Sequence, residues 1–223
     1  MLKIEHTEVV GWEAAIRGMR NPMSSWEKSD SQTCTNCNGC LPGQECERYK
    51  NGTFIGTNDL DLMTRLRNAG TDHRKFMRMI IVYLDITAPL YYWKEFDTYK
   101  VGTVANSCST MHKIADKEFT LEDFSCEHLE NSWLAHLKET IRLLNDARDA
   151  YNWCNTDAKK EWWWQMIQLL PSSYNQKRTV MLNYEVLANM YKSRRNHKLD
   201  EWHTFCEWIE SLPYSELITG KGD

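Results

Sequence analysis

The chain has 223 residues, of which 42% are hydrophobic, and this is enough to fill the core of one large domain or of two small ones. The formal net charge is only -4 and the basic residues are dispersed, which excludes a protein that tracks a nucleic-acid backbone and leaves room for a small anionic ligand. No run approaches about 18 apolar residues, and the N-terminal MLKIEHTEVV is neither a signal nor a transit sequence, so we expect a cytoplasmic protein without membrane contact. We expect residues 1–223 to form a single domain.

The first quarter of the chain predicts a strand, a helix and a long irregular segment. Residues 2–10 begin with apolar side chains at alternate positions, Leu2 and Ile4, and continue with β-branched residues, which predicts a first or edge strand. Residues 12–20 have a helical pattern that stops near Asn21. Residues 29–56 show no period and many turn formers, so we expect a long loop or an inserted module there.

A second helix and a central strand follow. Asn58 is the expected N-cap of the helix, and Gly70 supplies its left-handed stop. Residues 78–87, RMIIVYLDIT, are rich in β-branched and aromatic side chains and are bounded by Pro89. This composition predicts a strand in the centre of a sheet.

A turn-rich loop, residues 96–113, comes soon after this strand. Its sequence, FDTYKVGTVANSCSTMHK, is crowded with hydroxyls, amides and one thiol. Such a loop predicts a polar pocket for a phosphate or a nucleotide.

The second half of the chain is mostly helical by pattern. Residues 120–151 carry apolar side chains at helical spacing and predict one long helix or two joined ones. Residues 161–171, EWWWQMIQLLP, predict a helix ended by its proline. Residues 178–195 and 199–213 predict two more helices, each with an apolar stripe. The balance of elements predicts an α+β fold that is mainly helical.

Eight cysteines in a cytosolic chain are expected to serve metal binding, reactivity or packing rather than disulfides. Four of them lie within thirteen residues of a Gly/Asn-rich segment: Cys34, Cys37, Cys40 and Cys46. Their sulfurs could surround one zinc ion at about 2.3 Å. The alternatives are an iron–sulfur cluster and a flexible insertion with reduced thiols. Three dispersed cysteines are expected to be small buried hydrophobes: Cys126, Cys154 and Cys206.

Three other groups of side chains allow a functional and a structural interpretation. His73 follows a helix stop, where it either faces a cofactor or caps the helix. The triplet Trp162 to Trp164 could stack on a flat ligand, but helical spacing turns two of the three toward the core or a subunit partner, so we expect packing. Arg194 and Arg195 lie near a helix end, where they either satisfy the last carbonyls or bind a phosphate.

Three stretches follow one another in an order and spacing known from one family. They are LRNAGTDHRKF (66–76), APLYYWKEFDTYKVGTVANSCSTMHK (88–113) and LLPSSYNQKRTVMLNYEVLANMYKSRRNHKLDEW (169–202). They resemble the flavin-dependent thymidylate synthases, also called thymidylate synthase complementing proteins. The first resembles the Gly-His segment before the family's flavin-facing strand, and the second the stretch that ends in RHR-x-x-S-x-N-x-x-S-x-R-Y. The third resembles a run of Leu-Pro, a Tyr, an Asn-x-Arg helix, and an Arg before a Gln-Trp-Glu-type segment.

The second stretch departs from the family motif at several positions. Three residues stand where the family has RHR: Thr98, Tyr99 and Lys100. Thr103 replaces the first Ser, and a one-residue offset brings Asn106 and Ser109 into place. Met111 and His112 occupy the Arg-Tyr positions. Loss of that Arg removes a bidentate phosphate ligand.

The third stretch departs from the family pattern at one charged position. Asn183 matches the family, but Glu185 sits where the family has Arg, which reverses a charge. The later family Arg corresponds to Arg194 when counted from Asn183, and to Arg195 when counted back from Trp202.

The resemblance implies an α+β fold in which a mixed or antiparallel sheet packs with several long helices. It also implies a homotetramer with FAD and dUMP at subunit junctions. The implied activity converts dUMP to dTMP, with methylenetetrahydrofolate as carbon donor and NADPH to reduce the flavin. In the family's chemistry the reduced flavin supplies hydride, and no enzyme nucleophile attacks the base. The protein orients the cofactor and stabilises charge on the pyrimidine.

The resemblance also implies roles for individual residues. On the flavin side we expect a group of five: His73, Tyr99, Lys100, Thr103 and Asn183. Asn106, Ser109 and Arg194 are expected to contact the nucleotide. Arg194 or Arg195 would polarise the pyrimidine, with Ser109 at the reacting centre.

Cys108 allows a different hypothesis, in which its thiolate adds to the pyrimidine as in the non-flavin synthases. His112 is the nearby side chain in the sequence that could lower the thiol pKa, and a packed thiol is the alternative.

Two other classes of function stay open beside the divergent synthase. One is a non-catalytic or altered-substrate nucleotide-binding paralogue, because Met111 and Glu185 change the expected charges. The other is a metal-stabilised interaction protein that works through its Cys loop. The first predicts ligand binding without turnover, and the second predicts stoichiometric zinc without flavin.

Overall fold

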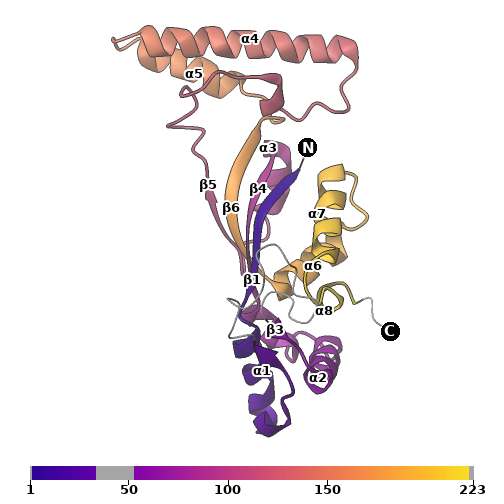
Figure 1. Ribbon diagram of the computed structural model, residues 1–223. Helices are drawn as coiled ribbons and strands as arrows, with labels where there is room; N and C mark the ends of the chain where they lie inside the picture. The colour runs from indigo at the N-terminus through magenta and orange to yellow at the C-terminus, as the bar shows by residue number, and fades with distance from the viewer. Residues whose placement is uncertain (1, 34–52, 221–223) are drawn as a thin grey trace, which may run out of the picture. The chain divides into compact units, whose positions relative to one another are not determined.

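The computed structural model describes residues 2–33 and 53–220 (Figure 1). Contacts divide the chain into two compact units. The first unit consists of residues 2–5, Asp85–Thr98 and Ala105–Thr179, and the second consists of the described parts of His6–Leu84, Tyr99–Val104 and 180–220. The single domain expected over residues 1–223 stays a prediction.

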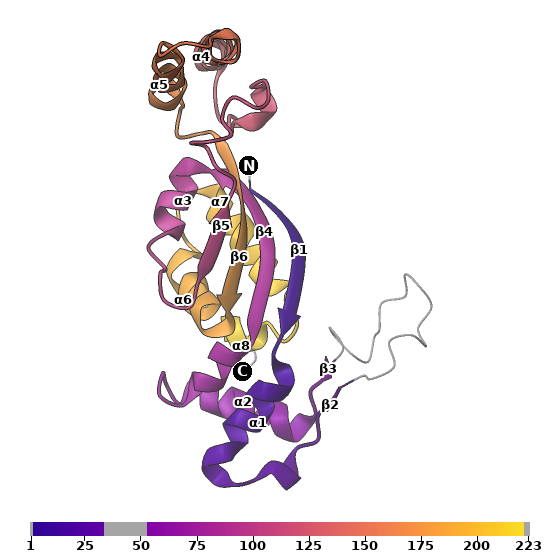
Figure 2. The same ribbon diagram turned by 90° about the vertical axis from the view of Figure 1, so that its left-hand side faces the viewer.

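Four strands form one antiparallel sheet in the order β1-β4-β6-β5 (Figure 2). Their bounds are β1 (Lys3–Val10), β4 (Ile81–Pro89), β5 (Val104–Ser107) and β6 (Asn175–Asn183). β4 is the predicted central strand, and Val82 and Leu84 are buried on either side of the exposed Tyr83. β1 lies at one edge, as the sequence predicts, and β5, which lies within the expected loop, is the exposed strand at the other edge.

The helices account for the larger share of the fold, so the predicted α+β class is confirmed. The α-helices are α1 (Trp12–Arg20), α2 (Thr57–Asn68), α3 (Leu90–Phe96), α4 (Asn131–Trp153), α5 (Lys159–Leu169), α6 (Tyr184–Arg194), α7 (Asp200–Glu210) and α8 (Glu216–Thr219). The 3-10 helices are η1 (Asn21–Met23), η2 (Trp26–Lys28), η4 (Arg74–Met79) and η5 (Leu121–Asp123). Across residues 2–33 and 53–220, no helix combines the length and the apolar character needed to cross a membrane.

The helix predicted over residues 178–195 is wrong in its first third. Residues up to Asn183 belong to β6, and the helix α6 begins at Tyr184. Within the sheet, Val180 and Leu182 are buried on either side of the half-buried Met181, which is the period of a strand, whereas the apolar run Val180–Leu182 fits a strand or a helix by sequence alone. Asn183 then ends the strand and caps the helix.

In the first unit, α4 and α5 lie side by side (Figures 1 and 2). Residues 120–151 hold η5 and one long helix, α4, rather than two joined helices. A buried cluster joins the two helices to the segment before them: Ile114, Ala115, Phe119, Phe124, Leu137, Ile141, Leu144, Ala147 and Met166. Trp163 packs against this cluster, whereas Trp162 and Trp164 are exposed.

In the second unit, α6 packs against α7, α8 and η4. The largest fully buried side chains there include Trp202 and Phe205 of α7 and Tyr184 of α6. Trp202 contacts Phe205 with ring centroids 5.6 Å apart and the rings nearly perpendicular, the edge-to-face arrangement that aromatic pairs favour. Buried aromatic side chains of α6 and α7 therefore form part of the core of this unit.

The start of α2 is capped by a distant residue, so the prediction that Asn58 is the N-cap is wrong. Gly56 occupies the cap position and has no side chain. Instead the Asp30 carboxylate accepts hydrogen bonds from the backbone amides of Asn58 and Asp59, at 2.9 and 3.1 Å. A Cβ on Gly56 would lie 2.2 Å from Cγ of Asp30, so only glycine allows this approach.

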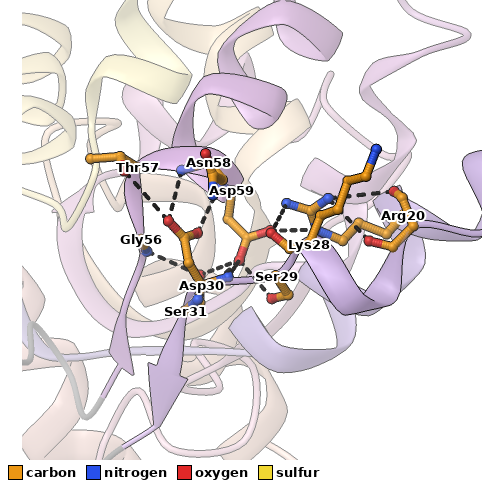
Figure 3. A network of polar contacts seen from close by, with 10 residues as sticks. Arg20, Lys28, Ser29, Asp30, Ser31, Gly56, Thr57, Asn58 and Asp59 are labelled. Carbon is orange, nitrogen blue, oxygen red and sulfur yellow. Dashed lines mark hydrogen bonds and ion pairs between the residues drawn. The ribbon is translucent and has the colours of Figure 1, made fainter.

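Asp59 is the centre of a polar network next to this cap (Figure 3). Its side chain is fully buried and accepts a hydrogen bond from Nε of Arg20 at 2.6 Å. The hydroxyls of Ser29 and Ser31 donate to its other oxygen at 2.7 and 2.6 Å. Burial alone raises the pKa of Asp59, but these bonds and the charge of Arg20 outweigh burial and lower the pKa below its ordinary value.

The same network holds together the described ends of the irregular segment 29–56. Here β2 (Gln32–Thr33) and β3 (Thr53–Phe54) pair antiparallel, with Gln32 opposite Phe54 and Thr33 opposite Thr53.

Candidate functional site

Residues 99–103 form a turn that lies against the start of α6. Thr103 Oγ1 donates a hydrogen bond to the backbone oxygen of Tyr99. Gly102 has a φ of 79°, in the left-handed region, and a Cβ there would lie 2.6 Å from Nδ2 of Asn183. The turn can therefore meet Asn183 only because position 102 is glycine.

Asn183 connects this turn to α6. Its Oδ1 accepts a hydrogen bond from the backbone amide of Val186 at 2.9 Å, which is the N-cap bond of the helix. The side chain is buried, and its amide nitrogen faces Gly102. One side chain thus both starts α6 and supports the turn.

Arg194 lies in the last turn of α6 and contacts two aromatic side chains. Its Nε donates a hydrogen bond to the phenol oxygen of Tyr99 at 2.9 Å. Its guanidinium carbon lies 5.5 Å from the centroid of the Tyr99 ring and 4.8 Å from that of the Trp202 ring, within the range of cation–π attraction. Because Cβ atoms tilt toward the start of a helix, the side chain can reach back along α6 toward the turn.

The turn therefore contacts residues from both ends of α6. We call this arrangement the α6 site, and its members are Tyr99, Gly102, Thr103, Asn183, Arg194 and Trp202. Four of them were predicted as site residues from two separate stretches of sequence. Lys100, a fifth predicted residue, lies in the same turn with its side chain exposed.

Arg194 and Arg195 have different surroundings. Arg194 contacts the turn through Tyr99, whereas Arg195 is exposed and lines a cavity of about 620 Å³ formed by α6 and α7. Counting along the sequence from Asn183 or back from Trp202 left the choice between the two open. The geometry associates Arg194 with the other predicted residues.

Glu185, where the family has Arg, binds two arginines that the sequence did not single out. Arg74 Nε donates to one carboxylate oxygen at 3.2 Å, and Arg78 Nε donates to the other. Burial alone raises the pKa of Glu185, but the bonds and charges of Arg78 and Arg74 outweigh it and lower the pKa. His73, the predicted flavin-side residue, is exposed and directly precedes Arg74. The reversed charge on α6 is thus balanced by arginines from η4.

The predicted nucleotide residues Asn106 and Ser109 belong to the first unit. Asn106 lies in β5 with its side chain exposed. Ser109 Oγ accepts a hydrogen bond from the backbone amide of His112 at 3.0 Å and lines a cavity of about 280 Å³. The other uncharged polar residues that line this cavity are Thr87, Thr110, Tyr174, Asn175 and Gln176, and the charged ones are Lys117, Glu122, Asp123 and Lys177.

Both lysines that line this cavity are paired with carboxylates. Lys117 binds Asp123, and Lys177 Nζ lies 3.0 Å from Asp85 and 3.7 Å from Glu5. Hydroxyls and amides, rather than a surplus of positive charge, would therefore select a ligand in this cavity. Such a lining suits an uncharged polar part of a nucleotide better than a phosphate.

Cys108 lines the same cavity through a segment whose backbone is held on both sides. Its amide donates to the backbone oxygen of Lys177 at 2.9 Å, and its own backbone oxygen accepts from Nε2 of Gln176 at 2.8 Å. The residue is exposed, so the packed-thiol interpretation does not fit it. Cys206 does fit that interpretation, because it is buried and burial raises the pKa of its thiol to about 11.

The described residues contain no group of three or more His, Cys, Asp or Glu side chains placed to hold a metal ion. The predicted metal ligands Cys34, Cys37, Cys40 and Cys46 lie outside the described residues. The zinc site stays a prediction.

No protein-family model matches the chain, and no curated protein matches it in sequence. Solved structures do match it. Two structures of the flavin-dependent thymidylate synthase from Helicobacter pylori, complexed with FAD and dUMP, cover 98% and 99% of this chain and 98% of their own, with TM-scores of 0.65 and 0.64 and identities of 15% and 14%. A UMP/dUMP methylase from Streptomyces cacaoi, bound with 5-Br dUMP, covers 99% of this chain and 95% of its own, with a TM-score of 0.57 and 12% identity.

The chain has the fold of the flavin-dependent thymidylate synthases. The matches cover nearly all of this chain and nearly all of the matched chains, and this carries the conclusion, because insertions or missing elements would lower the coverage. The resemblance expected from the sequence is thus confirmed for the fold.

The turn 99–103 and the residue before η4 carry donors of the kinds that bind an anionic ligand. Lys100 and His73 are exposed and offer N–H donors of the kind that bind phosphate oxygens. Tyr99 adds an aromatic face and Thr103 a hydroxyl in the same turn. The sequence did not point to Gly102 or to the Arg74–Arg78 pair, because their roles depend on contacts with residues far along the chain.

Proposed function

We propose that the protein is a flavin-dependent methyltransferase that converts dUMP to dTMP, with methylenetetrahydrofolate as carbon donor and NADPH as reductant. The α6 site carries this proposal. There the fold gathers Tyr99, Thr103, Asn183 and Arg194, which the family resemblance assigns to flavin and nucleotide. The match to enzymes described as complexes with FAD and dUMP supports the choice of ligands.

In this proposal the turn and the residue before η4 hold the flavin. Lys100 and His73 would bind the phosphates, and Tyr99, Thr103 and Asn183 would contact the rest of the cofactor. Bound FAD would supply the hydride chemistry that protein side chains lack. The task of these residues is to bind and orient it.

Arg194 acts on the pyrimidine. An arginine guanidinium carries a positive charge and several N–H donors, so it can polarise a ring carbonyl and stabilise negative charge that develops there. From the resemblance we also propose Asn106 and Ser109, in the first unit, as contacts for uncharged polar groups of a nucleotide, with a catalytic role for Ser109. Arg195 is the second candidate for the role of Arg194, and it is the weaker one because the cavity that it lines holds none of the other predicted site residues.

We also propose a homotetramer, because the resemblance implies active sites assembled from several chains. Analytical ultracentrifugation tests this directly. A monomer that still turns over dUMP would refute it. Zinc in the Cys34–Cys46 segment is a separate proposal, tested by elemental analysis of the purified protein.

The visible absorption spectrum of the purified protein, with the released chromophore identified, is the first test of the proposed function. Bound FAD followed by dUMP-dependent oxidation of NADPH in the presence of methylenetetrahydrofolate would support it. A colourless protein that takes up no added FAD would exclude it. Arg194→Gln should lower turnover by about a hundredfold or more. Arg65→Gln, at an exposed arginine paired with Asp61, is the control and should leave turnover unchanged.

An altered-substrate paralogue is the second candidate. Met111 and Glu185 favour it, because each replaces an expected arginine and Glu185 is itself neutralised by Arg74 and Arg78. This hypothesis predicts that FAD and a uridine nucleotide bind without formation of dTMP. Titrating dUMP and UMP separately, and analysing the products, distinguishes it from the first.

A further inference from the structure

The guanidinium of Arg194 is held by two aromatic side chains from different parts of the second unit. Tyr99 comes from the turn and supplies both a hydrogen-bond acceptor at 2.9 Å and a ring face at 5.5 Å. Trp202 comes from α7 and supplies a second ring at 4.8 Å. The two rings also contact one another, with centroids 6.2 Å apart and planes at 65°.

Both rings are packed against further residues of the second unit. Trp202 has no exposed surface and makes edge contacts with Phe205 and His197, at 5.6 and 6.3 Å between centroids. The turn that carries Tyr99 is closed by the Thr103 hydroxyl and lies against Asn183 at Gly102. Neither ring can move far without disturbing a packed neighbour.

A guanidinium held in this way has a restricted orientation. Arginine ordinarily has large rotamer freedom, and a planar group with one N–H bonded and its carbon close to two rings loses most of it. The bond at Nε fixes the direction in which the two terminal nitrogens project. Orientation of this kind raises a rate when the same group must meet charge that develops during a reaction.

We propose that Tyr99 and Trp202 are positioning residues that hold Arg194 in one orientation for its action on the pyrimidine. The inference rests on the proposed function, and it adds a role for Tyr99 to the expected flavin contact. The two roles differ in what they predict. A flavin contact made by the Tyr99 hydroxyl would change FAD affinity when the hydroxyl is removed, whereas a positioning role would change the nucleotide step.

Tyr99→Phe is the central variant, because it removes the hydrogen bond to Arg194 and keeps the ring. We expect unchanged FAD affinity by fluorescence titration and a loss in kcat on the order of tenfold, as for the loss of one hydrogen bond to a charged group. Tyr99→Leu, which also removes the ring, should lose more. Tyr83→Phe removes the hydroxyl of a tyrosine exposed on β4 and serves as the matched control.

A cycle with Arg194→Gln shows whether Tyr99 acts through Arg194. Binding of dUMP is measured in the wild type, in each single variant and in the double variant. Positioning predicts that Tyr99→Phe weakens binding severalfold when Arg194 is present and less than about twofold when it is absent. Equal effects in both backgrounds would overturn the inference.

The Nε–H resonance of Arg194 gives a readout that needs no ligand. In the free protein it should be protected from solvent exchange, and Tyr99→Phe should abolish that protection. If protection is lost while kcat and dUMP affinity stay unchanged, the inference fails and the proposed function stands. If the wild type shows protection but binds neither FAD nor dUMP, the proposed function fails, and the positioning role in that reaction fails with it.

Discussion

Replacing Asp59 with asparagine tests the polar network at the start of α2. The Asp59 side chain is fully buried and that of Arg20 is 5% exposed, with 2.6 Å between Nε and Oδ1. The other oxygen of Asp59 accepts four hydrogen bonds, from the hydroxyls of Ser29 and Ser31 and the amides of Asp30 and Ser31. Asparagine has one acceptor oxygen and an NH2 group that can only donate. In either orientation its NH2 therefore faces other donors, which are the Arg20 guanidinium on one side and the hydroxyls and amides on the other.

The cost follows from what remains around Arg20. Removing one charge of a buried ion pair costs about 3–5 kcal/mol. Arg20 keeps bonds to the backbone oxygens of Ser25 and Lys28, at 3.2 and 3.1 Å, which still satisfy its terminal nitrogens. We therefore expect Asp59→Asn to lower the free energy of unfolding by about 3 kcal/mol, the lower end of that range. Asp61→Asn breaks an exposed pair on the same helix and should cost at most about 0.5 kcal/mol.

Urea denaturation of the wild type and both variants measures these differences. The pKa of Asp59 is lowered in the folded protein, so its contribution is fully present above the unfolded pKa, ordinarily 3.8, and is lost as pH falls through the folded pKa. The gap between the wild type and Asp59→Asn should thus be constant near neutrality and shrink below about pH 4. Equal, small effects of the two variants at pH 7 would refute this reasoning.

Three further substitutions test the α6 site and its flank. Gly102→Ala should destabilise the protein by about 1–2 kcal/mol and weaken FAD binding, because the Cβ would meet Asn183. Gly70→Ala is the control, because Gly70 has a φ of 108° and open space around it. This control should cost only the backbone strain of about 1 kcal/mol and leave FAD binding unchanged. Asn183→Ala removes the N-cap of α6 and should cost about 1 kcal/mol in urea denaturation, and an unchanged stability would show that the cap is not needed. Glu185→Gln leaves two arginines without their shared counter-charge and should cost about 1–2 kcal/mol, an effect that 0.5 M salt should reduce; a cost insensitive to salt would contradict an electrostatic origin.

Local pattern was sufficient where an element is decided by its own residues. β4 was predicted from its β-branched run, and α1, α5 and α7 from their periods, because burial of one face selects these periods directly. The error over residues 178–183 arose because the local pattern there is ambiguous. A short apolar run fits a strand or a helix equally well, and only its place in the sheet between β4 and β5 decided between them.

The sequence by itself determined the α+β class and the family resemblance, and it predicted a set of site residues in separate stretches. Only the tertiary structure decided which of them meet. Tyr99 and Arg194 are 95 positions apart, and their contact depends on the turn at Gly102 and on the packing of α7 against α6. Asp30 caps α2 across 28 positions in place of the local candidate Asn58. Contacts of this range leave no periodic trace in a single sequence, because each partner is chosen by the fold and not by its neighbours along the chain.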